Sequence, residues 1–329
     1  MKKFITVLLV VTLILGLCSC GSKSQQSSGR DSSKLITVGF AQCKADESDW
    51  RKANTKSVQE ALSEENGFKL ILADSNNDAA KQVADVQGFI DQEVEYIIIA
   101  AVNEDGWDTV LKNAKNAGIP VILMDRTINA SEDLYTCWIG GGFYEEGVKA
   151  TDWMETRFSK DQQVNIVHLQ GQLGASAQVG RTKALEDAVA KNSNWKIIAQ
   201  QTGDWSTDRA KEIMASWIKQ YGDDIHCVYA ENDNMADGAI QALEEAGKKV
   251  GGKDGIAIIS FDANRAYLQM TLEGKINCNV ECNPLLGPGV AEIIRKIETG
   301  ETPKKKESVE ETAFYWDTIT QEIIDARPY

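Results

Sequence analysis

The feature that most constrains the fold is a repeated alternation of short apolar runs with longer amphipathic segments. From Lys34 onward, each apolar run is followed by a stretch whose apolar residues have helical spacing, as in 78–91. This order is typical of strand–helix units that build a parallel sheet covered by helices on both faces. The sequence therefore predicts an α/β fold.

The predicted strands fall into two series with the same order of elements. The first series is 36–40, 70–72, 96–100 and 120–124, and the second is 164–169, 196–198, 227–230 and 257–261. A flexible glycine run at 140–142 separates them and suits a hinge. The length of 329 residues accommodates two domains. We predict two doubly wound parallel-sheet lobes with a ligand crevice at the carboxyl ends of their strands.

The first residues have the layout of an export signal. Lys2 and Lys3 precede an apolar run, 4–17, that is too short to span a bilayer comfortably. The stretch 17–21 resembles the bacterial lipobox, with Cys20 as the residue that receives lipid. We predict a lipoprotein signal peptide over 1–20, a flexible polar tether over 21–33 and an extracytoplasmic, lipid-anchored protein. The alternative is an ordinary signal peptide with incidental cysteines.

Charge and composition exclude several classes of protein. The net charge of −14 and the lack of a basic stripe argue against nucleic-acid binding. The chain has two histidines without a cluster of other ligands around them, so we expect no metal and no cofactor. Five cysteines follow Cys20, an odd number, and their pairing stays open. We expect Cys278 and Cys282 on one strand, too far apart to form a disulfide.

Short motifs in both halves resemble a known family. They are 38–42, 49–51, 125–126, 169–171, 174–176, 229–233 and 261–262. In their order and spacing the chain resembles the type I periplasmic sugar-binding proteins of bacterial ABC importers, in the ribose- and galactofuranose-binding group. The resemblance implies three crossings between lobes. The N-terminal lobe would then comprise 34–141 and 282–312, and the C-terminal lobe 142–281 and 313–329.

The resemblance also implies a set of ligand-binding residues. They are Glu47, Trp50, Arg51, Asp125, Arg126, Arg181, Trp205, Asn232, Asp262 and Glu281. Carboxylates accept hydrogen bonds from sugar hydroxyls and guanidinium groups donate them, while an indole suits the apolar face of a sugar ring. The alternatives are a local salt bridge for Asp125 and Arg126, and packing within each lobe for Trp50 and Trp205.

These observations predict a monomeric binding protein and not an enzyme. The ligand would be galactofuranose or a related pentose or hexose, handed to an ABC permease and its ATPase after hinge closure. The segment 174–178 lacks the last glycine of a nucleophile elbow, and 251–254 lacks the hydroxyl of a phosphate loop. A DNA-bound repressor would need a helix-turn-helix where the signal peptide stands. A sensor that presents the sugar to a histidine kinase or chemoreceptor remains open.

Overall fold

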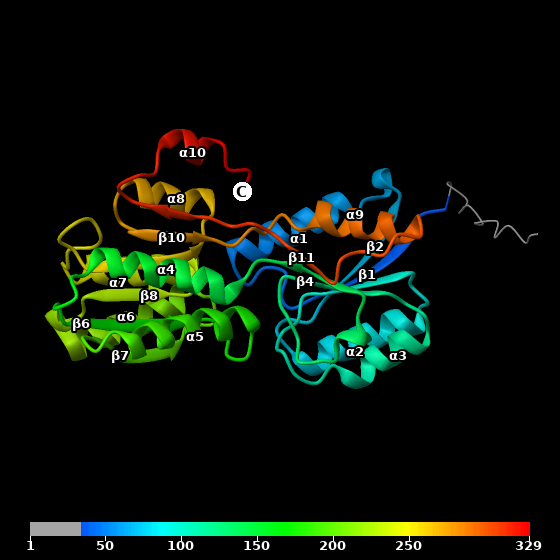
Figure 1. Ribbon diagram of the computed structural model, residues 1–329, viewed down its shortest axis with the longest axis horizontal. Helices are drawn as coiled ribbons and strands as arrows, with labels where there is room; N and C mark the ends of the chain where they lie inside the picture. Colours follow the sequence, from blue (N-terminus) through cyan, green and yellow to red (C-terminus); the bar gives the residue numbers. More distant parts are fainter. Residues whose placement is uncertain (1–33) are drawn as a thin grey trace, which may run out of the picture. The chain divides into compact units, whose positions relative to one another are not determined.

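The computed structural model describes residues 34–329, which form two α/β lobes (Figure 1). The two lobes and their parallel sheets were predicted and are confirmed. The expected signal peptide (1–20) with Cys20 and the expected tether (21–33) lie outside the described residues. Within residues 34–329, no helix combines the length and the apolar character needed to cross a membrane.

The first sheet is built of six parallel strands. Their spatial order is β11 (Lys306–Ser308), β5 (Cys137–Gly140), β4 (Val121–Met124), β3 (Tyr96–Ile99), β1 (Ile36–Gln42) and β2 (Phe68–Asp74). One face is covered by α1 (Asp49–Ala61) and α9 (Gly287–Glu298), and the other by α2 (Ala79–Asp91) and α3 (Asp108–Asn116). Both faces of a strand are therefore buried, which explains why these strands are continuous apolar runs.

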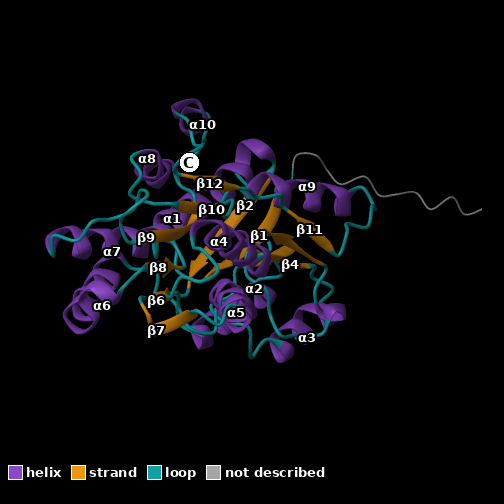
Figure 2. Ribbon diagram, turned by 60° about the vertical axis from the view of Figure 1, so that its left-hand side comes forward, coloured by secondary structure: helices purple, strands orange, loops and turns teal. Residues whose placement is uncertain are grey.

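The second sheet has the same plan with one antiparallel edge. Its order is β12 (Ala313–Tyr315), β10 (Cys278–Glu281), β9 (Ala257–Asp262), β8 (Cys227–Ala230), β6 (Val164–Gln170) and β7 (Trp195–Thr202), and β12 runs antiparallel to β10. Helices α4 (Phe143–Arg157) and α5 (Ser176–Lys191) cover one face, and α6 (Thr207–Tyr221) and α7 (Asp233–Glu245) cover the other. Helices α8 (Arg265–Leu272) and α10 (Gln321–Asp325) share a small apolar cluster. Figure 2 shows the strands lying between helices.

The chain passes between the two sheets three times. It leaves the first sheet after β5 and enters α4, returns after β10 to α9, and crosses again between β11 and β12. Two of these passages are joined by a backbone hydrogen bond, in which the Glu281 N–H donates to the Thr312 carbonyl oxygen at an N···O distance of 2.8 Å. The strands β5, β11 and β12 were not predicted, and β11 and β12 have only three residues each, too few for a recognisable periodicity.

Several helices begin at side chains that cap their first turn. The Ser48 hydroxyl accepts a hydrogen bond from the Arg51 N–H at the start of α1, and the Asn232 side chain accepts one from the Met235 N–H at the start of α7. Such caps satisfy backbone donors that the helix itself leaves free. They also fix where α1 and α7 begin, at the ends of β1 and β8 that face the other lobe.

Close packing of α6 on α7 leads to a stability prediction. A Cβ atom at Gly238 would lie 2.2 Å from the Thr207 carbonyl oxygen, whereas one at Gly88 in α2 would meet nothing within 4 Å. We expect Gly238→Ala to lower the free energy of unfolding by about 1–3 kcal/mol because the helices must separate. Gly88→Ala should raise it by about 0.5–1 kcal/mol through backbone entropy. Urea denaturation measures the change in the free energy of unfolding for both variants. Equal changes would contradict the close approach of α6 and α7 at Gly238.

Candidate binding site

A cavity lies between the two lobes, at the carboxyl ends of their strands. About 300 Å³ of it is not filled by protein atoms. We call it the central cavity. Its polar lining is Glu47, Ser48, Arg51, Asp125, Arg126, Arg181, Asn232 and Asp262, and its less polar lining is Trp50, Phe143, Ala177, Trp205 and Cys282. Open parallel sheets bind ligands at this edge because their loops converge there.

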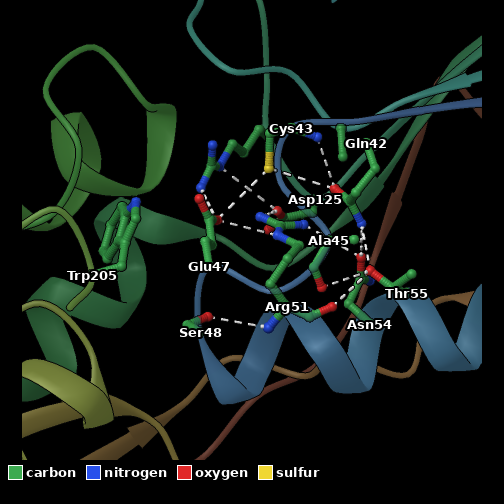
Figure 3. A network of polar contacts seen from close by, with 12 residues as sticks. Gln42, Cys43, Ala45, Glu47, Ser48, Arg51, Asn54, Thr55, Asp125 and Trp205 are labelled. Carbon is green, nitrogen blue, oxygen red and sulfur yellow. Dashed lines mark hydrogen bonds and ion pairs between the residues drawn. The ribbon is translucent and has the colours of Figure 1, made fainter. Parts of the chain in front are cut away.

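Two arginines and two carboxylates form an ion-pair network in the first lobe (Figure 3). Arg51 Nη2 lies 2.6 Å from Asp125 Oδ2, and its Nε lies 3.3 Å from Glu47 Oε1. Arg126 Nη2 lies 2.6 Å from the same Glu47 oxygen. Burial would raise the pKa of Glu47, but Arg126 and Arg51 outweigh it and hold that pKa below its ordinary value. Glu47 is therefore ionised and fixed in place.

A third arginine organises the second-lobe side of the cavity. Arg181 on α5 lies 2.7 Å from Glu146 Oε2 and 3.8 Å from Asp262 Oδ1, and it donates to the Glu231 carbonyl oxygen. Burial raises the pKa of Asp262 well above its ordinary value, although Arg181 acts in the opposite direction. A protonated Asp262 carboxyl can both donate and accept a hydrogen bond, which suits a hydroxyl group.

Three lining residues have backbone angles that side chains rarely adopt. The φ angles are 64° at Asp125, 63° at Trp205 and 103° at Asp262. Hydrogen bonds hold the strained backbone of Asp125, whose N–H donates to Ile139 and whose carbonyl accepts from the Trp138 indole. Strain of this kind costs about 1–3 kcal/mol per residue and clusters at functional sites.

Two indole rings enter the cavity from different sheets. Trp50, near the start of α1, donates through Nε1 to the Cys282 carbonyl oxygen at 2.6 Å. Trp205 follows β7 and has the Arg126 guanidinium of the first lobe 5.8 Å from its ring centre. Figure 3 shows its ring on the other side of Glu47 from Asp125. A Cβ at Gly171 would lie 1.9 Å from the Trp205 ring, so this glycine lets the ring lie against the backbone. Both rings are fixed platforms.

Glu231 ties the second-lobe loops together from beneath. Its carboxylate lies 2.9 Å from His168 Nε2, and it accepts hydrogen bonds from the Thr182 hydroxyl and the Gly171 N–H at 2.6 and 2.7 Å. Because the Glu231 carbonyl also accepts from Arg181, one residue positions the helix that carries Arg181 and the loop beneath Trp205.

The lobes touch at the edges of the cavity. Asp49 and Asn234 exchange two hydrogen bonds of 3.2 Å, and the Tyr267 hydroxyl donates to Asp49 at 3.1 Å. At another edge the Thr127 N–H donates to the Ser176 hydroxyl at 2.9 Å. These contacts join residues from the two sheets, so the structure represents a closed arrangement.

The buried carboxyl group of Glu146 and the partly buried one of Glu311 lie close together where the chain passes between lobes. Glu311 accepts a hydrogen bond from the Asn283 N–H at 2.8 Å, and a Cβ at Gly141 would lie 2.2 Å from its Oε2. Among residues 34–329 no N–H or hydroxyl group reaches Glu146 Oε1. Burial, followed by the charge of Glu146, raises the pKa of Glu311 to about 10. A protonated Glu311 therefore donates to Glu146, whose other oxygen holds Arg181.

Nine of the ten residues expected to bind the ligand line the central cavity. Glu281 does not line it. Its carboxylate pairs with Arg327 at 2.8 Å and accepts from the Thr312 N–H at 3.1 Å, so it joins two passages between the lobes. Sequence reasoning missed Ser48, Phe143, Ala177 and Cys282. Phe143 could have been found as the aromatic residue after the glycine run, but nothing in the sequence singles out Ala177.

The buried cysteines are all unpaired in the described part of the chain. They are Cys43, Cys137, Cys227, Cys278 and Cys282. Cys278 begins β10, and Cys282 directly follows its end. One group of three possible metal ligands occurs among residues 34–329, namely Glu146, Cys282 and Glu311, with ligand atoms within 4.8 Å of one another. Arg181 lies 2.7 Å from Glu146 Oε2 and so balances the charge of one member of this group.

Two lobes, three passages and a polar cavity between them define a ligand-binding protein that closes around its ligand. Residues 38–294 match the model of the periplasmic binding protein domain, and the chain belongs to this family. Membership implies an extracytoplasmic location, and the related proteins described below bind sugars and are not enzymes.

Three similar proteins bear names that mention sugars in the furanose form. The galactofuranose-binding protein YtfQ of Escherichia coli is 37% identical over 88% of this chain and 90% of its own. A Mycobacterium smegmatis protein solved in complex with β-D-fucofuranose is 40% identical, with a TM-score of 0.81 over 86% of this chain and 92% of that chain. The binding protein of the arabinose ABC transporter from Shewanella sp. ANA-3, solved with α- and β-L-arabinofuranose, is 35% identical, with a TM-score of 0.80 and the same coverage.

The shared proton at Glu311 predicts a pH dependence of stability. The folded-state pKa of about 10 lies above the ordinary value of 4.5, so folding takes up a proton between these values. The stabilisation is complete below about pH 4.5 and is lost as the pH rises toward 10. In Glu311→Gln the amide keeps a donor and an acceptor but does not titrate. We expect the wild type to lose up to about 1.4 kcal/mol of unfolding free energy per pH unit relative to this variant.

Urea denaturation from about pH 5 to 9 measures this difference in slope. Glu310→Gln, at the exposed neighbouring position, is the matched control and should follow the wild type. Identical slopes for all three proteins would rule out a proton shared between Glu311 and Glu146.

Proposed function

We propose that the protein captures a monosaccharide in its furanose form, galactofuranose or a related pentose or hexose, and delivers it to an ABC-type permease. The observation that carries the proposal is the central cavity, in which each of three guanidinium groups is paired with a carboxylate beside two indole rings. Paired carboxylates and guanidinium groups recognise vicinal hydroxyls, since one accepts and the other donates in a fixed geometry.

The size of the central cavity favours a single sugar ring. About 300 Å³ inside it is not filled by protein atoms, less than a third of the roughly 1,070 Å³ in either of two neighbouring cavities. Trp50 and Trp205 are 5% and 4% exposed, and a ring between them would be removed from water. An oligosaccharide does not fit within this cavity alone.

The charge of the site favours a neutral ligand. Arg51, Arg126 and Arg181 each have a carboxylate oxygen within 2.7 Å, so the charge of each guanidinium group is already balanced, which disfavours an anionic sugar acid. Among residues 34–329 Arg126 Nε makes no hydrogen bond and is left as a donor to a neutral ligand oxygen. Charge-assisted hydrogen bonds to a ligand contribute about 1.5–3 kcal/mol each, and micromolar affinity needs only about 8 kcal/mol. A wrong stereoisomer would leave buried charged groups without partners, which is costly.

The names of the relatives support the furanose form. Three similar proteins, each 35–40% identical, are described as binding galactofuranose, fucofuranose or arabinofuranose. In the closed arrangement Asp49 and Asn234 join the lobes, so the ligand enters while they are apart and closure follows. Nine of the ten residues inferred from the resemblance would then touch or frame the sugar.

Titration calorimetry with galactose, arabinose, ribose, xylose, fructose and myo-inositol tests this proposal. We expect one-to-one binding of one sugar, and at least a hundredfold loss of affinity in Asp125→Ala because Arg51 is left buried without its closest partner. Asp133→Ala removes an exposed ion pair to Lys115 and should leave affinity unchanged. If none of these sugars binds, or if the two variants bind the sugar with equal affinity, the assigned site is refuted.

We also propose that Cys20 anchors the protein to the outer face of the bacterial cell membrane, as a monomer beside its permease and ATPase. Tethering would keep the local concentration of loaded protein high. We expect Cys20→Ser to move the protein from the membrane fraction to the medium, as followed by immunoblotting. Cys18→Ser should leave it with the membrane, and retention of both variants would contradict the lipidation of Cys20.

Transport and sensing predict different phenotypes for cells that lack the protein. If the protein serves a permease, cells that lack it lose high-affinity uptake of the sugar. If it presents the sugar to a membrane kinase or chemoreceptor instead, uptake persists and only the response to the sugar is lost.

A further inference from the structure

A second cavity adjoins the central one at the rim of the cleft. It is larger, with about 1,070 Å³ not filled by protein atoms, compared with about 300 Å³ for the central cavity. One wall comes from the first lobe, at 44–48 and Asn77, and the other from the second lobe, at Gln172 and 204–209. We call it the outer cavity. Its walls are loops that follow β1, β2, β6 and β7, the same edge of the sheets that builds the central cavity.

The two cavities share three lining residues. Glu47, Ser48 and Trp205 face both, so these side chains alone stand between the two spaces. Another cavity of about the same volume shares only Phe143 with the central one. A substituent on a sugar in the central cavity therefore has its most direct exit past Glu47 and Trp205.

The outer cavity contains polar atoms that lack partners. Within the described residues, Asn77 Oδ1, Gln172 Oε1 and Trp205 Nε1 are buried and make no hydrogen bond. A buried polar group without a partner loses its bonds to water and gains none in return, so native proteins keep few of them. No side-chain atom of this kind occurs on the residues that line the cavity next to Phe143. Two acceptors and one donor match what hydroxyl groups offer.

The charges on the walls oppose a charged occupant. Asp204 is paired with Arg209 at the rim, and Lys52 lies 3.1 Å from Asp49. Three further charged residues, Lys44, Asp46 and Asp208, also line the outer cavity and include both signs, so no single charge dominates its walls. The buried atoms without partners belong to neutral amide and indole groups. A neutral, hydroxyl-rich group fits this chemistry better than a phosphate or an ammonium group.

We propose that the outer cavity is a second saccharide subsite, and that the protein binds furanosyl glycosides in which the furanose occupies the central cavity and the next sugar occupies the outer one. The proposal rests on the proposed function, because the central cavity must hold the first ring. The glycosidic oxygen passes between Glu47 and Trp205. Gln172 and Asn77 then accept hydrogen bonds from hydroxyls of the second ring, and Trp205 donates one.

Calorimetry with two probes tests the subsite, methyl β-D-galactofuranoside and a disaccharide of galactofuranose linked to galactose. The disaccharide should bind at least as tightly as the methyl glycoside. Gln172→Ala should weaken the disaccharide about fivefold, the equivalent of one hydrogen bond, and change the methyl glycoside less than twofold. Gln172 makes no hydrogen bond through its side-chain oxygen within residues 34–329, so its removal leaves the fold intact. Asp125→Ala is the control that should abolish binding of both probes.

The outcomes separate the two proposals. Binding of the methyl glycoside together with rejection of the disaccharide would overturn the second subsite and leave the monosaccharide site standing. An equal loss of both probes in Gln172→Ala would also overturn it, since Gln172 would then act on the central cavity. Failure of both glycosides to bind while a free sugar of the calorimetry panel binds would overturn the second subsite alone, whereas failure of both glycosides and of every free sugar would overturn the proposed function.

Discussion

The burial of three guanidinium groups between carboxylates is the interaction on which the site depends. Taking such charges out of water costs several kcal/mol per ion, and only close pairing with good geometry offsets this cost. Arg51 and Arg126 are held by Asp125 and Glu47 of the first lobe, and Arg181 by Glu146 of the second. The charges of these arginines are therefore neutralised within each lobe before the lobes close. Closure requires no ion pair between a residue of one lobe and a residue of the other.

The same pairing connects the cavity with the passages between the lobes. Arg181 borders the cavity and holds Glu146, and Glu146 shares a proton with Glu311, which lies on the last passage. Glu281 is bound to Arg327 near the end of the chain. The sequence alone does not distinguish these carboxyl groups, but in the structure they have three different environments. Some are ionised beside arginines, some share a proton within a pair, and some lie outside the central cavity.

Much of the fold could be predicted because both sheets are covered on both faces. Strands such as β3, with the run Tyr96–Ile99 buried on all sides, appear in the sequence as unbroken apolar segments. The strands β5, β11 and β12 were missed because their pairing is specified by neighbours distant in the sequence, as where Trp138 pairs with Lys306. The resemblance predicted residues at strand ends well, but Ala177 lines the cavity only because α5 begins beside it.

The sequence by itself determined the two-lobed α/β plan, because local patterns of apolar and polar residues encode it, and the family resemblance predicted most side chains at the cleft. Only the tertiary structure decided that Glu281 faces Arg327, that Glu311 meets Glu146, and that an outer cavity adjoins the central one. These features depend on how far-separated segments meet where the chain passes between the sheets. No local pattern specifies the distance between residues that lie dozens of positions apart, as Glu281 and Arg327 do.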